Sequence, residues 1–242
     1  TISQPNSGRA ATRNKGAKYA KGDLLIFCDD DMRPARDSIE KHVHFHKNIQ
    51  GGICGGNQLE DDDLMQTDIQ RYKAYLSKIW TSKYDDGINK LSASNLFLTA
   101  SNMSLSKHLF QKLGGFNETL TDAEDYEFAV RALSSNIPIY FDKSNVAWHD
   151  DFITCRKYIH RQREYALASD RLNTIIPKKY QRNDPETKMI FIKKVIYKIF
   201  STPIIVQWID NDKLIWLPRF LRYKIYEVTI FALGKIYVRN PM

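Results

Sequence analysis

The chain has 242 residues, of which 43% are hydrophobic and 26% are charged, a composition that argues against a disordered protein and suits one large α/β domain with an appendage. Three cysteines without close spacing (Cys28, Cys54 and Cys155) argue against a disulfide framework or a zinc ribbon, and favour a reducing, cytoplasmic compartment. The net charge of +8 is uneven: residues 1–150 hold 18 Lys and Arg against 20 Asp and Glu, whereas residues 151–242 hold 18 against 8. This division suggests metal chemistry in the first part and an anionic partner for the second.

The first predicted element is a helix over residues 8–20, with no apolar strand before it. A doubly wound sheet normally begins with a buried strand, so we expect that the chain from Thr1 lacks the first strand of its sheet. The apolar run over 24–28 predicts a buried strand, which an acidic triplet ends. Pro34 then permits a helix to about Asn48.

The middle of the chain continues the alternation of strands and helices. The pattern predicts a small-residue strand or turn over 51–57, an acidic loop over 58–66, a helix over 69–83, a strand over 96–105, a short helix capped by Ser106, a helix from Thr121 to about Ser134, short strands over 137–141 and 146–148, and a basic helix over 152–172. Thr121 and Glu124 fit a capping box, with Thr121 as the N-cap. We therefore predict an α/β domain over 1–150, with a mostly parallel sheet flanked by helices, and a basic helical region over 151–242.

The acidic triplet Asp29-Asp30-Asp31 follows the buried strand at its carboxyl end, where ligands bind in open α/β sheets. Alternation along an extended segment places Asp29 and Asp31 on one side. Two carboxylates on one side can hold a hard cation such as Mn²⁺ or Mg²⁺ that keeps positions for phosphate oxygens. A second triplet, 61–63, follows no apolar strand and is assigned to a solvated loop.

A second acidic motif, Glu124-Asp125, opens the predicted helix over 121–134. Asp125 lies near the positive end of that helix, where a carboxylate is stabilised in its charged form. An ionised carboxylate is what a general base requires. The pair is therefore a candidate for the catalytic residues.

Two stretches of this sequence carry several motifs in a fixed order. Residues 8–31 contain the segment Thr-Arg-Asn-Lys-Gly at 12–16 in the predicted helix, followed by a Gly-Asp turn, a hydrophobic strand and an Asp-x-Asp motif. Residues 99–131 contain a Gly-Gly-Phe-x-Glu turn at 114–118, a Glu-Asp pair and a helix that carries Arg131. In order and spacing both stretches resemble family 2 glycosyltransferases, whose helix motif is Ala-Arg-Asn-x-Gly, with Thr12 here in place of the usual Ala.

The resemblance implies a GT-A fold, which is Rossmann-like, and inverting, metal-dependent transfer from a nucleoside-diphosphate sugar to a hydroxyl of a glycan or lipid-linked acceptor. It implies that Asp31 is the principal metal ligand and that Asp29 faces the ribose or the metal. Asp125 becomes the catalytic base, with Glu124 contacting or supporting the acceptor.

The remaining candidates lie on the donor side. The resemblance puts Arg13 near the nucleotide, although Arg13 on its own also suits a solvated helix position. We take Asp29, Asp30 and Asn102 as further candidates for binding the nucleotide. His149 follows a predicted strand and resembles a histidine that binds metal or diphosphate; a polar strand-end residue is the alternative. His42 and His46 share a helix face but have no evident third ligand for zinc.

The basic last third mixes cations with large apolar residues, among them Lys188, Lys193, Lys194, Lys198, Arg219, Arg222, Lys224, Trp216, Phe220, Tyr223 and Tyr226. One interpretation is a peripheral surface on the inner face of an anionic membrane, near a lipid-linked acceptor. The other is ordinary helices packed on the catalytic domain. Two further function classes stay open: a nucleotidyltransferase acting on sugar phosphates, and a non-catalytic basic domain that binds membrane or nucleic acid, although no nucleic-acid motif accompanies the charge.

Overall fold

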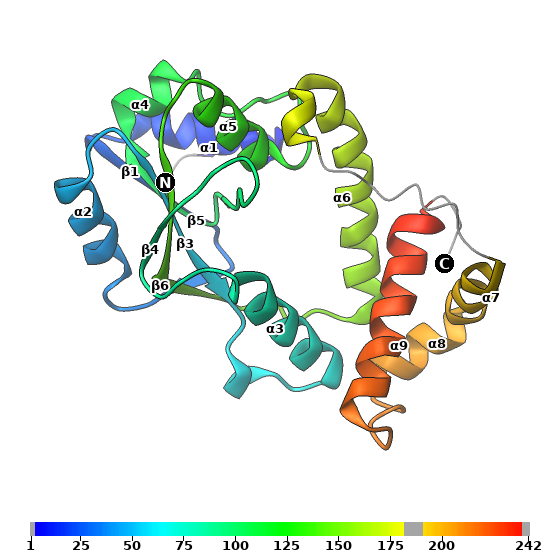
Figure 1. Ribbon diagram of the computed structural model, residues 1–242. Coiled ribbons are helices and arrows are strands. Elements are labelled where there is room, and N and C mark those ends of the chain that lie inside the picture. Colours follow the sequence, from blue (N-terminus) through cyan, green and yellow to red (C-terminus); the bar gives the residue numbers. More distant parts are fainter. Residues whose placement is uncertain (1–2, 182–190, 239–242) are drawn as a thin grey trace. The chain divides into compact units, whose positions relative to one another are not determined.

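The computed structural model describes residues 3–181 and 191–238 (Figure 1). Lys188 and the side chains of Lys193 and Lys194, which belong to the predicted basic surface, lie outside the described part of the chain. The helices are α1 Gly8–Tyr19, α2 Ser38–Asn48, α3 Asp68–Thr81, α4 Lys107–Lys112, α5 Glu124–Ser134, α6 Cys155–Ile175, α7 Phe191–Phe200, α8 Pro203–Asp210 and α9 Arg219–Phe231. The strands are β1 Leu24–Cys28, β2 Met32–Pro34, β3 Ile53–Leu59, β4 Ile88–Lys90, β5 Asn102–Ser106 and β6 Ile139–His149. Shorter helical turns are η1 Asp62–Leu64, η2 Lys178–Tyr180 and η3 Ala232–Ile236.

The chain forms two compact units. The first contains residues 1–60, 77–150 and 171–181, and the second contains 61–76, 151–170 and 182–242. Each unit draws on segments from both sides of residue 150. The division of the sequence into two domains at that position stays a prediction.

The first unit is built on a mixed sheet with the strand order β1-β5-β3-β6-β2, and β4 also pairs with β6. The predicted α/β class, a sheet flanked by helices, is confirmed, but the expectation of a mostly parallel sheet is wrong. Among the described strands only β3 and β6 pair in parallel. β5 runs opposite to both of its neighbours, and the short strands β2 and β4 pair antiparallel with β6. An apolar run predicts that a strand forms but carries no information about its direction.

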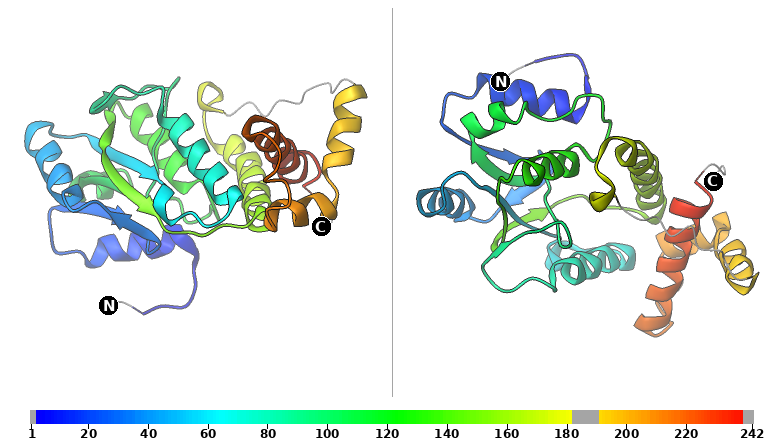
Figure 2. Two further views of the ribbon diagram at one scale, coloured as in Figure 1. Left: turned by 90° about the horizontal axis from the view of Figure 1, so that it is seen from below. Right: turned by 45° about the horizontal axis from the view of Figure 1, so that its top comes forward.

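The two faces of this sheet are chemically different, as β5 demonstrates. Met103 and Leu105 point into the main core, whereas Asn102 and Ser104 alternate to the opposite face. The core face packs against α1, α4 and α5 through Ala10, Ala17, Leu109, Phe110, Phe128 and Ala129. On the other face, buried His42 of α2 bonds both Asn102 and Ser104 at 2.9 and 2.8 Å. Figures 1 and 2 accordingly show α2 apart from α1, α4 and α5.

Local signals predict some helix ends correctly and others incorrectly. The Ser106 hydroxyl accepts a hydrogen bond from the Leu109 N–H, so the predicted N-cap of α4 is confirmed. The capping box at Thr121 is wrong, because α5 begins at Glu124 after Ala123, whose φ is +61° and which makes no side-chain cap. The Glu124 carboxylate bonds Arg13 instead.

The second unit has a core of its own, formed by α3, α6, α8 and α9. Ile69, Tyr72, Ile159, Ile209 and Tyr226 are members of this cluster. Within the described ranges, no helix has both the length and the apolar character to cross a membrane.

Candidate active site

Arg13 of α1 joins the two acidic motifs that the sequence singles out. Its guanidinium donates one hydrogen bond to the Glu124 carboxylate and a second, of 2.5 Å, to Asp29 Oδ1. The Arg13 and Glu124 side chains are only 13% and 3% exposed. Burial by itself lowers the pKa of Arg13, but the carboxylates of Asp29 and Glu124 outweigh it and raise that pKa. The arginine is therefore a fixed cation between an end of β1 and the start of α5.

Asn14, the next residue of α1, fixes the turn that follows α4. Its side-chain amide donates to the Phe116 carbonyl at 2.9 Å and to Glu118 Oε1 at 2.8 Å, while its Oδ1 accepts from the Phe116 N–H at 2.8 Å. Gly115 has a φ of +71°, and a Cβ there would lie 2.7 Å from Asn14 Oδ1. The Arg-Asn segment and the Gly-Gly-Phe turn thus form one structural unit.

Asp125 lies at the first turn of α5 and is half-buried. The backbone N–H groups of Ala100 and Tyr126 donate to its carboxyl at 3.3 and 2.7 Å. Burial, and then the neighbouring Glu124 charge, raise the pKa of Asp125 to about 6, against the lowering effect of those N–H groups and of Arg13. A carboxylate with this pKa is ionised at neutral pH and is a stronger base than an ordinary aspartate.

His149, the last residue of β6, contacts the exposed Asp31 carboxylate, with 3.1 Å between His149 Nε2 and Asp31 Oδ2. The Asp150 N–H donates to the Asp31 carbonyl at 2.9 Å, which holds the two strand ends together. On the other side of the ring, His149 Nδ1 is 4.0 Å from Oε1 of the buried Glu60. The arrangement places an imidazole between a buried and an exposed carboxylate.

The predicted metal ligands are only partly brought together. The structure pairs Asp31 with His149 and ties Asp29 to Arg13. In the part of the chain that the structure describes, no three His, Cys, Asp or Glu side chains are grouped so that they could hold a metal ion. An exposed carboxylate beside an imidazole still suits a divalent cation that takes its other ligands from phosphate and water.

The other donor-side predictions differ in their surroundings. Asp30 is exposed at the end of β1. Asn102 is 4% exposed, and its side-chain amide donates to the Asn145 carbonyl at 3.0 Å while its Oδ1 contacts His42. Its amide is therefore used inside the protein, between β5 and α2, and a role at the nucleotide stays a prediction.

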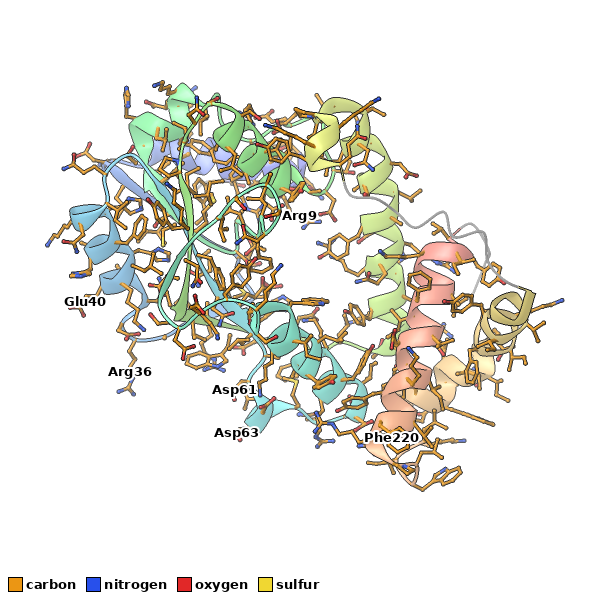
Figure 3. All side chains as sticks on the ribbon, in the orientation of Figure 1. Arg9, Arg36, Glu40, Asp61, Asp63 and Phe220 are labelled. Carbon is orange, nitrogen blue, oxygen red and sulfur yellow. The ribbon has the colours of Figure 1, made fainter. Side chains whose placement is uncertain are left out.

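Two residues at the site were missed from the sequence. Glu60 directly follows β3, so the strand-end rule that identifies Asp29 and Asp31 applies to it, but the acidic run after it suggested a solvated loop. That loop exists, since Asp62 and Asp63 are exposed in η1, where the Asp61 side chain accepts from the Asp63 N–H (Figure 3). Asn14 lies within the helix motif at residues 12–16, but only its hydrogen bonds to Phe116, 102 positions later, reveal its role.

Comparison with curated proteins finds glycosyltransferases. The chain is 43% identical over 51 residues to the uncharacterized glycosyltransferase YfnE of Bacillus subtilis, covering 21% of this chain and 13% of that protein. It is 28% identical over 165 residues to the O-antigen chain rhamnosyltransferase RfbN of Salmonella typhimurium, covering 66% and 52%. An uncharacterized glycosyltransferase of Haemophilus influenzae is 24% identical over 141 residues, covering 54% and 42%. The chain thus spans at most about half the length of these relatives.

Two solved structures are similar at low sequence identity. S. aureus TarS 1–349 in complex with UDP is 15% identical, with a TM-score of 0.48, over 96% of this chain and 72% of that one. GalNAc-T7 with UDP, GalNAc and Mn²⁺ is 14% identical, with a TM-score of 0.47, over 72% of this chain and 39% of that one.

The sequence model of one family, described as glycosyltransferase like family 2, matches residues 2–166, which is more than half of the chain. The protein therefore belongs to the family 2 glycosyltransferases.

Proposed function

We propose that this protein transfers a sugar from a nucleoside-diphosphate sugar to a hydroxyl of a growing glycan, with inversion at the anomeric carbon. The observation that carries the proposal is the Arg13 bridge, in which one buried guanidinium holds both Asp29 of the donor-side motif and Glu124 of the acceptor-side motif. Membership of the glycosyltransferase family favours this reaction over the nucleotidyltransferase and non-catalytic alternatives.

Asp125 acts as the base in this proposal. Its carboxylate takes the proton of the acceptor hydroxyl, the hydroxyl oxygen attacks the anomeric carbon, and the bond from that carbon to the diphosphate breaks, with its electron pair leaving on the diphosphate. Direct displacement by one base inverts the configuration. The pKa of about 6 supports the role, because most of the group is ionised at neutral pH yet retains appreciable basicity.

Mn²⁺ or Mg²⁺ would be held by Asp31 and His149, and would offset the negative charge that develops on the departing diphosphate. The resemblance that suggests Asp29 as a further ligand stays part of the proposal. Arg13 would keep Asp29 and Glu124 oriented while donor and acceptor bind.

The partners and the location are proposed at a coarser level. The chain's similarity to an O-antigen chain rhamnosyltransferase supports a glycan or lipid-linked acceptor in polysaccharide synthesis. The surplus of cations after residue 150 supports a cytoplasmic protein in peripheral contact with an anionic membrane.

The test is turnover of a panel of UDP-, GDP- and dTDP-sugars with Mn²⁺ or Mg²⁺, in the wild type and two variants. Asp125→Asn is expected to lower turnover by about 10²–10⁴-fold, as lost base catalysis does, with nucleotide binding by calorimetry nearly unchanged. Asp31→Ala is expected to abolish the response to the cation while the fold survives.

Asp62→Asn, in the exposed acidic turn, is the matched control and is expected to turn over like the wild type. If Asp125→Asn turned over at the normal rate, Asp125 would not be the base, and Glu124 would be the next candidate. An unchanged cation response in Asp31→Ala would contradict the metal assignment.

A further inference from the structure

The segment that joins α8 to α9 and the first turn of α9 together expose four large apolar side chains, which we call the apolar tip: Ile215, Trp216, Phe220 and Leu221. Their exposed fractions are 54%, 76%, 72% and 44%. Figure 3 labels Phe220 at the N-terminal end of α9. Four exposed large apolar residues within seven consecutive positions point to a site of interaction.

The apolar tip stands on a rigid base. Leu214 and Tyr223, which flank it, are 6% and 8% exposed and belong to the core of the second unit. Arg222 donates to the Leu217 carbonyl at 2.9 Å and binds the buried Asp68 through two hydrogen bonds. Asp212 Oδ1 accepts from the Asp68 N–H at 3.0 Å. The tip is thus held outward by the fold, and its exposure does not arise from a loose loop.

Cations surround the apolar tip. Lys213, Arg219 and Lys224 are exposed. Of the nearby carboxylates, Asp212 accepts a hydrogen bond from the Asp68 N–H at the start of α3, and Glu227 pairs with Lys224 at 2.9 Å. The Arg219 guanidinium lies 5.0 Å from the centroid of the Tyr223 ring. These five charged residues carry three positive charges and two negative ones, so the rim of the tip has a small net positive charge.

We infer that the apolar tip inserts into the interfacial region of an anionic lipid bilayer, with Trp216 and Phe220 as the residues that enter it. Exposed aromatic side chains with a basic rim suit the boundary between headgroups and acyl chains of an anionic bilayer. The inference rests on the membrane contact given under Proposed function. It assigns that contact to the apolar tip, whereas the sequence alone suggested only the basic last third of the chain as a whole.

Vesicle flotation tests the assignment without any need for transferase activity. The wild type is expected to float with vesicles of phosphatidylcholine and phosphatidylglycerol and much less with phosphatidylcholine alone. The double variant Trp216→Ser/Phe220→Ser is expected to lose about tenfold or more of its binding. Trp80→Ser is the matched control, since Trp80 is a 50% exposed tryptophan on α3, and it is expected to bind like the wild type.

Depth is measured by quenching of tryptophan fluorescence with brominated lipids. Quenching is expected in the wild type and is expected to be largely lost in Trp216→Phe, a variant that still floats. Flotation of the double variant at the wild-type level would overturn the inference and assign the contact to another surface. If the wild type floats with neither kind of vesicle, both the membrane contact and its assignment to the apolar tip are wrong. Glycosyl transfer is tested separately, by measuring turnover with a soluble acceptor. A wild-type dimer that the double variant converts to a monomer would make a second copy the occupant, and the inference would be wrong.

Discussion

At the scale of single residues, the site is a balance of buried charges. Arg13 faces two carboxylates directly, and its charge also lowers the pKa of Asp125. Glu124 acts in the opposite direction and raises the pKa of Asp125. Of the three carboxylates around Arg13, Asp125 is the one whose charged form is least stabilised, so its pKa is raised. A raised pKa is the property that a general base at neutral pH needs.

This ionisation has a consequence for stability that can be measured. The pKa of Asp125 rises from 3.8 to about 6 in the fold, so folding favours the protonated form. The stabilising effect of that raised pKa is complete below about pH 4 and is lost as the pH rises through about 6. Asp125→Asn stays neutral, so we expect it to raise the free energy of unfolding by roughly 2–3 kcal/mol at pH 8 and by much less at pH 4.

Urea unfolding of wild type and variant at the two pH values measures this difference. Asp30→Asn removes an exposed carboxylate from the same region and reports the effect of net charge alone. An Asp125→Asn variant no more stable at high pH than the wild type would show that burial of this carboxylate carries no cost.

At the scale of elements, α1 and the turn after α4 hold each other in place. Asn14 makes three hydrogen bonds to that turn, and Gly115 supplies both the positive φ and the space for the Asn14 side chain. The contact orients Arg13, which precedes Asn14 on the same helix. A change at the turn is therefore expected to disturb the site as well as the fold.

Two glycine substitutions separate these effects. Gly115→Ala is expected to lower the free energy of unfolding by roughly 1–3 kcal/mol, because its φ of +71° is strained for alanine and the new Cβ meets Asn14 Oδ1. Gly16→Ala, inside α1 with open space around the new Cβ, is expected to stabilise by about 0.5–1 kcal/mol. Thermal unfolding of both variants gives the comparison. An unchanged free energy of unfolding in Gly115→Ala would contradict the proposed role of the contact between Asn14 and this turn.

At the scale of the whole molecule, the second unit depends on one buried carboxylate. Asp68 is 1% exposed and accepts hydrogen bonds from Arg222 Nε at 2.6 Å, Arg222 Nη2 at 2.9 Å and the Tyr226 hydroxyl at 2.9 Å. It thereby joins the start of α3 to α9 across more than 150 residues of sequence. Removing one partner of a buried pair leaves the other charge without compensation.

Asp68→Asn is accordingly expected to lower the free energy of unfolding by roughly 3–5 kcal/mol. Hydrogen exchange is expected to show the loss of protection in residues 61–76, 151–170 and 191–238, which belong to the second unit, and not in β3 or β6. Asp86→Asn is the control, because Asp86 pairs with Lys143 at a fully accessible position, and no measurable change is expected there. Equal loss of protection in both units would indicate that they unfold together.

Local patterns in the sequence determined much of this protein. The apolar run over 24–28 becomes β1 with the same bounds, the helix over 8–20 is α1 to within a residue, and Ser106 caps α4. The acidic motifs and the family could also be read directly, because strand ends and short motifs are properties of neighbouring residues. The three-residue strands β2 and β4 were not found, since three residues are too few to show a period of two.

The tertiary structure alone decided what those motifs contact. Arg13 and Glu124 are 111 positions apart, and Asp31 and His149 are 118 apart, so neither pair leaves a trace in any local pattern. The same holds for the directions of the strands, for the use of Asn102 inside the protein, and for Glu124 as a partner of Arg13 instead of a member of a capping box. Local propensity sets which residues form a strand or a helix, but the packing of the sheet and its helices selects the partners of each buried charge, because an unpaired charge in the interior costs more than any local signal can offset.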